Sequence, residues 1–183
     1  MDWYALTKFA HVVFAIVWVG GGFMLVLSGI LAERADDRAA MVANLRNTAK
    51  LGNLVFLPAS LLTLVSGLVM CWFWAGFTDA WILVGLAGYA STFVVGAGVM
   101  KPTSDRLLAA IAAGGLDDAA LVVGRRMLRI ARFDYTAMLV TIAAMVLKPT
   151  SEDVAVLAAM AALFVAGAVL FLLPRGGGRL ASA

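Results

Sequence analysis

Residues 4–31 read YALTKFAHVVFAIVWVGGGFMLVLSGIL. This stretch is longer than the roughly 20 apolar residues that a helix needs to cross a bilayer, and Lys8 is the one basic residue inside it. It is too long for the apolar core of a cleaved signal peptide, and no basic segment precedes it. The stretch therefore predicts a retained membrane-spanning helix near the N-terminus.

Four further apolar stretches extend this pattern and predict an all-α bundle of five membrane spans in a single transmembrane domain, residues 1–183. The composition agrees, because 63% of the 183 residues are hydrophobic and 14% are charged, whereas a soluble domain is about half apolar and about a quarter charged. The fourth stretch is short, and it reaches across the bilayer only if its helix starts earlier, within residues 121–132. The predicted spans are residues 4–31, 51–74, 80–100, 133–147 and 154–173.

The basic residues predict how these spans are oriented. With the N-terminus outside and the C-terminus inside, all of the 14 Lys and Arg except Lys8 and Lys148 fall on the cytoplasmic face. Short loops rich in Lys and Arg stay in the cytoplasm. We therefore expect a multi-pass protein of the bacterial cytoplasmic (inner) membrane. The same pattern accounts for the net charge of +3 without a nucleic-acid partner.

Two cytoplasmic segments, residues 33–50 and 104–132, are amphipathic. The second is broken at Gly114–Gly115, after which Asp117 or Asp118 is expected to cap the next helix, since a carboxylate satisfies its free N–H groups. Four arginines gather near one face of that helix. They predict a surface for anionic lipid headgroups or a protein partner, formed by Arg125, Arg126, Arg129 and Arg132.

Residues 99–105, VMKPTSD, resemble residues 146–152, VLKPTSE. Both copies contain Lys-Pro-Thr-Ser, and Lys favours a helix C-terminus while Pro cannot continue the helix. Both copies therefore predict helix stops, with an inverted duplication as the alternative. Residues 76–79 predict a tight turn, which would make the second and third spans antiparallel neighbours.

The single histidine, His11, lies inside the first span, about 10 Å below its outer boundary. Ionisable groups at that depth are costly and usually functional. Trp18 and Gly22 share its helical stripe with Lys8 beside it, and the glycines at 20–22 leave room for a helix or a flat cofactor. One interpretation is a neutral imidazole bonded across helices to Ser, Thr or a backbone carbonyl. The other is an axial ligand of haem b, with Lys8, Trp18 and Gly22 around the cofactor.

Sulfur side chains fall at a depth similar to that of His11. Imidazole with thioether suits haem iron, and imidazole with thioether or thiolate suits copper(I). The sequence thus predicts candidate metal ligands at His11, Met70, Cys71 and Met160. No carboxylate lies well inside a predicted span, which disfavours a proton-coupled carrier that relies on a buried Asp or Glu. No catalytic residue is predicted.

The segment Lys8–Gly21 resembles the opening helix of a loose group of bacterial membrane proteins. The group comprises HemJ-type protoporphyrinogen oxidases, CopD-type copper-resistance proteins and a bacterial domain-of-unknown-function family of predicted integral membrane proteins. The last is similar in its His-x6-Trp-x-Gly-Gly opening and in a late helix ending in Met-x-x-Lys-Pro, here Met145–Pro149. The HemJ-type likeness implies that His11 is an axial haem ligand, although the lysine of that family is absent from residues 81–86. The CopD-type likeness implies copper handling.

Three classes of function remain after these arguments. The first is a non-catalytic accessory or assembly subunit of a larger membrane complex, which fits the small size, apolar bulk and basic inner face. The second is a haem-binding redox or haem-handling protein, and the third is copper handling at the outer leaflet. The expected partners are the lipid bilayer together with protein partners or further copies of the chain.

Overall fold

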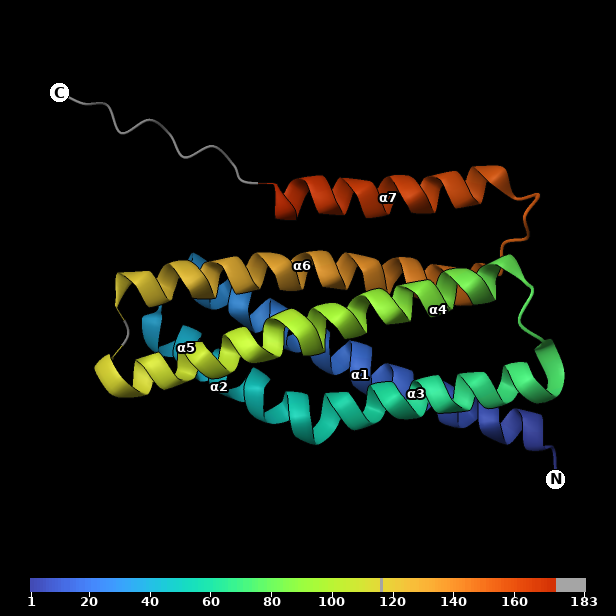
Figure 1. Cartoon of the computed structure of the whole chain (residues 1–183), viewed down its shortest axis with the longest axis horizontal. Coiled ribbons are helices and arrows are strands. Elements are labelled where there is room, and N and C mark those ends of the chain that lie inside the picture. Colours follow the sequence, from blue (N-terminus) through green and yellow to red (C-terminus); the bar gives the residue numbers. More distant parts are fainter. Residues whose placement is uncertain (116, 174–183) are drawn as a thin grey trace.

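The computed structural model describes residues 1–115 and 117–173, and every regular element within them is helical. Five helical stretches of this part of the chain are long and apolar enough to cross a membrane (Figure 1). The prediction of an all-α bundle of five spans is therefore confirmed. Arg175 and Arg179, which the predicted orientation places on the cytoplasmic face, lie outside the described residues. The five stretches are Trp3–Arg34, Arg38–Ala75, Ala80–Gly114, Asp118–Leu147 and Val154–Leu172.

Two of these stretches are composite helices, in which α-helical parts are joined through wider π-helical turns. Such turns form hydrogen bonds five residues apart and are often found at functional sites. The two segments predicted as separate amphipathic pieces therefore continue directly into spans. The elements are α1 (Trp3–Arg34), α2 (Arg38–Leu51), η1 (Gly52–Phe56), α3 (Leu57–Met70), η2 (Cys71–Ala75), α4 (Ala80–Phe93), η3 (Val94–Met100), α5 (Lys101–Gly114), α6 (Asp118–Leu147) and α7 (Val154–Leu172).

The two Lys-Pro sequences behave differently. The predicted stop at Lys101-Pro102 is wrong, because the helix continues from η3 into α5. The Lys101 N–H bonds to the carbonyl five residues back, so the chain enters Pro102 from a widened turn that tolerates the missing N–H group. The stop at Lys148 is confirmed: Lys148 adopts a left-handed conformation, φ 45°, and ends α6, and Pro149 beside it is buried. The Lys148 ammonium lies 5.0 Å from the Trp81 ring centroid, which ties this end of α6 to α4.

Helix α6 begins early enough to complete the short fourth span. The Asp117 side chain accepts a hydrogen bond of 2.7 Å from the Ala120 N–H, as the capping prediction required. Before it, Gly115 has φ 82°, a backbone conformation that other residues adopt only with strain. This residue ends α5 and separates it from α6. The segment 121–132 is thus part of the α6 helix.

The helices pack mainly in pairs. α1 lies chiefly against α3, α4 against α6, and α7 against α6 (Figure 1). The second and third spans run antiparallel through the turn at Gly76, but neither is the other's main packing partner, which corrects the neighbour prediction. The α4–α6 contact is close: a Cβ atom at Gly88 would lie 2.0 Å from Thr141 Oγ1. Small residues allow such close helix packing in membranes.

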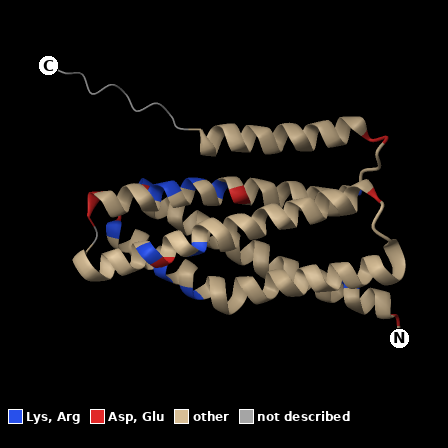
Figure 2. Ribbon diagram, in the orientation of Figure 1, with Lys and Arg blue, Asp and Glu red and all other residues tan. Residues whose placement is uncertain are grey.

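The outer surface of the bundle is apolar, with large exposed side chains such as Ile16, Val65 and Leu170 that suit contact with lipid. Lys and Arg gather toward one end (Figure 2). We call it the basic end; it holds the α1–α2 and α5–α6 turns. That this end faces the cytoplasm stays a prediction.

Candidate functional site

The His11 ring lies between α1 and α3. Its Nδ1 is 2.8 Å from the Thr63 carbonyl oxygen, and it donates a hydrogen bond there because a carbonyl oxygen only accepts. The Ser66 hydroxyl lies 3.3 Å from the same nitrogen. Gly67 makes room for the ring, since a Cβ atom there would lie 3.1 Å from His11 Cε1. This is the bond across helices to a backbone carbonyl that the first interpretation expected. In a neutral ring, Nε2 is then the nitrogen without a proton.

The four residues predicted around a cofactor are divided between two places. Lys8 is exposed, and its ammonium lies 5.9 Å from the Tyr4 ring centroid. Trp18 and Gly22 line an internal cavity nearer the basic end, and His11 does not line it. Trp18 also packs edge-on against Tyr89 of α4, with ring centroids 5.5 Å apart.

Of the candidate metal ligands, Met160 lies apart from His11. Met160 of α7 packs against Val140 and Ala144 of α6, whereas His11 contacts α3. Met70 and Cys71 lie at the end of α3 and the start of η2. In the described part of the chain no three or more His, Cys, Asp or Glu side chains gather as a metal site. The copper hypothesis thus stays a prediction from residue types.

A cavity of about 310 Å³ lies inside the bundle, in the half toward the basic end. Residues of α1, α2, η1, α3, α4, η3, α5 and α6 surround it, and its lining is mostly apolar. Ligand pockets in proteins usually measure about 300–1,000 Å³ and have such linings. Four glycines line it where an added Cβ atom would meet nothing within 4 Å: Gly22, Gly52, Gly96 and Gly124. The cavity therefore has room for a small, mostly apolar molecule.

Asp134 is the buried carboxyl group of this cavity, with 9% of the residue exposed. Its Oδ1 atom has no hydrogen-bond partner among the described residues. It lies about 20 Å along α6 from Leu147, at 1.5 Å per residue. This corrects the expectation that no carboxylate lies well inside a span. A carboxylate buried among apolar groups needs a cation or a proton to offset its charge.

The other polar side chains of the cavity differ in whether their hydrogen bonds are satisfied. Tyr135, Thr92 and Ser60 donate their hydroxyl hydrogens to backbone carbonyls, and the Tyr135 bond reaches from α6 to α1. The Ser104 hydroxyl is buried and has no partner in the described residues. Asp134 and Ser104 are therefore the lining residues that each have a buried side-chain oxygen without a hydrogen-bond partner in the described part of the chain.

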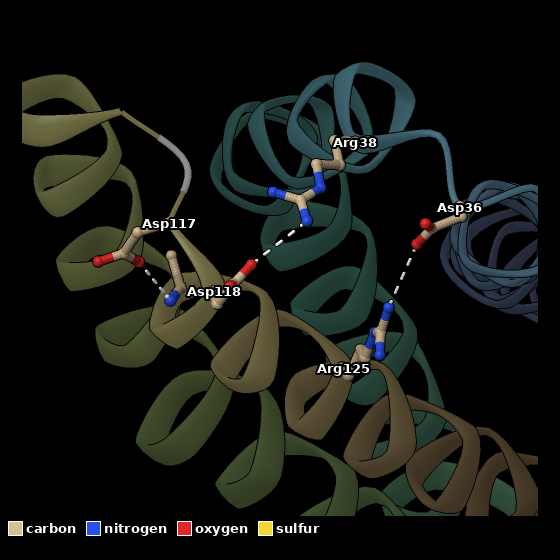
Figure 3. A network of polar contacts seen from close by, with 6 residues as sticks. Asp36, Arg38, Asp117, Asp118 and Arg125 are labelled. Carbon is tan, nitrogen blue, oxygen red and sulfur yellow. Dashed lines mark hydrogen bonds and ion pairs between the residues drawn. The ribbon is translucent and has the colours of Figure 1, made fainter.

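Ion pairs join α6 to the first two helices at the basic end (Figure 3). Arg125 of α6 pairs with Asp36 at 3.3 Å, and Arg38 of α2 pairs with Asp118 at 3.2 Å. A third pair, Arg132 with Glu33 of α1, is less exposed than these two. The contacts hold three walls of the cavity together.

The predicted arginine surface is therefore mixed. Arg125 and Arg132 take part in intramolecular ion pairs, whereas Arg126 and Arg129 are exposed and have no ion-pair partner in the described residues. Binding of anionic headgroups or a protein partner to this surface stays a prediction.

A family model described as "Predicted integral membrane protein (DUF2269)" matches residues 5–149, which begin inside α1, include α2 to α6 and end before α7. No curated protein and no solved structure matches the chain. The HemJ-type and CopD-type resemblances are not shown by these comparisons.

Proposed function

The chain belongs to the DUF2269 family of predicted integral membrane proteins, and we propose that its function is to bind a small, mostly apolar molecule inside the helix bundle. The single observation that carries this proposal is the cavity of about 310 Å³, which has open space at its glycines and a buried carboxyl group without a protein partner. The protein would act in a bacterial cytoplasmic membrane. The accessory or assembly role inferred from the sequence stays a prediction compatible with this one.

The glycines fall into two groups that support the proposal. Gly21 and Gly88 allow close contact, because a Cβ atom would lie 2.5 Å from the Phe56 ring or 2.0 Å from Thr141 Oγ1. Gly22 and Gly124 have no such neighbour and face the cavity instead. Glycine in a helix costs about 1 kcal/mol relative to alanine. Helix packing explains the first group, and a ligand that fills the space explains the second.

Filling the cavity is expected to displace the ligand. Leucine at Gly22 or at Gly124 would place a side chain in the open space, and leucine also favours helix more than glycine does, so these variants should fold. The measurement is mass spectrometry of small molecules released from the purified protein. We expect the amount of the molecule recovered to be at least about tenfold lower from both variants than from the wild type. The leucine side chain would occupy the volume that the molecule needs, and protein interiors are close-packed.

Gly20→Leu is the matched control, because Gly20 lies on the same helix, also has no neighbour within 4 Å and does not line the cavity. It should retain the ligand. Equal recovery from Gly20→Leu, Gly22→Leu and Gly124→Leu, or no molecule from the wild type, would contradict the proposal.

Haem binding at His11 is a second candidate, and one contact favours it. A histidine that binds a metal almost always donates its other ring N–H to a carbonyl, a carboxylate or water. The Nδ1 bond to Thr63 has this form and leaves Nε2 available. Haem iron held through Nε2 would supply electron transfer.

Absorption spectra of oxidised and reduced protein, purified gently from its native membrane, test this candidate. A Soret band that His11→Ala abolishes and Ile16→Ala retains is the expected result, because Ile16 lies on the same helix, is exposed and has no part in the haem hypothesis. A colourless wild type, or a band that persists in His11→Ala, rules out His11 as the haem ligand.

A further inference from the structure

We propose that the cavity binds an organic cation with an apolar body, a lipophilic amine, whose ammonium group pairs with Asp134. This inference rests on the proposed function, because it names the chemical class of the molecule that the cavity holds. It starts from the Asp134 carboxyl, which is buried and has an oxygen without a partner in the described residues.

The basic side chains nearest in sequence or in the cavity lining pair with other carboxylates. Lys101 lines the cavity, but its ammonium lies 3.0 Å from Asp105. Arg132, two residues before Asp134 on α6, pairs with Glu33. Buried charges in proteins are normally paired or neutralised by a proton. With no basic side chain left for Asp134, an ionised Asp134 takes its cation from outside the chain, and binding of a charged probe in preference to a neutral one tests this.

The rest of the cavity selects an organic cation over a metal ion. Hard metal cations take six or more oxygen ligands, and the described residues gather no group of acidic side chains at this site. The lining is mostly apolar and includes Trp18 and Phe56. An alkyl or aryl body would fill the space beside the glycines, while the ammonium group would pair with the Asp134 carboxylate.

Binding of octylamine and of octanol to the protein in lipid nanodiscs tests the inference, with empty nanodiscs subtracting partition into lipid. The two probes share an alkyl chain and differ in charge. We expect the wild type to bind octylamine at least about tenfold more tightly than octanol, since a charge-assisted bond is about twice as strong as a neutral one. Asp134→Asn should abolish that preference, whereas Glu152→Gln should keep it, because Glu152 is exposed and lies outside the cavity lining.

Failure of this inference can be told apart from failure of the proposed function. Equal binding of the two probes, lost in Gly22→Leu, would overturn the amine and leave the cavity as a binding site for neutral molecules. Binding of neither probe would also overturn the inference that the ligand is an amine. Mass spectrometry of the molecules released from the wild type would then test separately whether the cavity binds a ligand. If Asp134→Asn fails to fold, the wild-type preference and its loss in Gly22→Leu still decide the question.

Discussion

Gly88→Val is expected to force α4 away from α6 and to lower the free energy of unfolding by about 3 kcal/mol, the upper part of the range for overpacked cores. A Cβ atom at Gly88 would lie 2.0 Å from Thr141 Oγ1 and 3.2 Å from Thr141 Cβ. Thr141 cannot turn aside easily, because it is β-branched and its hydroxyl donates to the Ala137 carbonyl. The measurement is thermal unfolding of purified protein, followed by loss of its monodisperse size-exclusion peak.

Two further variants decide whether the contact itself causes the loss. Gly98→Val is the control, since Gly98 is exposed and a Cβ atom there would meet nothing within 4 Å. Gly88→Ala adds the Cβ atom alone and should also lower the stability. Thr141→Ala should restore part of that loss, because the double variant lacks the Thr141 Oγ1 atom that the new Cβ atom would meet at 2.0 Å. A Gly88→Val protein as stable as Gly98→Val would show that α4 and α6 do not pack as described.

Arg132→Ala is expected to lower the free energy of unfolding by about 2–3 kcal/mol. The side chains of Arg132 and Glu33 are only 25% and 24% exposed, so the variant leaves a carboxylate without its partner in a poorly hydrated place. Breaking a fully buried pair from one side costs about 3–5 kcal/mol, and the remaining exposure reduces this figure. Glu33→Ala combined with Arg132→Ala should recover part of the loss, since it removes the unpaired charge.

Arg38→Ala provides the matched comparison at the same end of the bundle. Its pair with Asp118 is 54% and 90% exposed, so we expect a loss below about 1 kcal/mol that shrinks further in high salt. If Arg38→Ala and Arg132→Ala lower the free energy of unfolding equally in the same thermal assay, burial does not make the Arg132–Glu33 pair the stronger one.

Much of the fold follows from the sequence because a bilayer allows few structures. Every backbone polar group in lipid must be satisfied within the chain, so long apolar stretches predict helices. The same logic predicted that α6 extends into residues 121–132 and that Asp117 or Asp118 caps it. It also anticipated the bond from His11 to a backbone carbonyl, since a polar ring in a span seeks a partner on a neighbouring helix.

The rest depends on tertiary contacts that hydropathy does not report. Asp134 is the second residue of the predicted span 133–147, where hydropathy does not show which way a side chain points, and α6 buries it beside the cavity. Lys101-Pro102 and Lys148-Pro149 share their residues but follow a π-helical and an α-helical turn, respectively. Neighbouring glycines such as Gly21 and Gly22 are alike in sequence, and only their surroundings in the bundle separate packing from open space.

The attachment of α7 has a consequence for the order in which the protein is made. α7 packs chiefly against α6, and the cavity is lined without it. Chains are synthesised from the N-terminus at about 5–20 residues per second, so α1 to α6 enter the membrane seconds before α7 does. The walls of the cavity can therefore meet while the last helix is still inside the ribosome. A ligand present in the membrane during those seconds would encounter a complete site on a nascent chain.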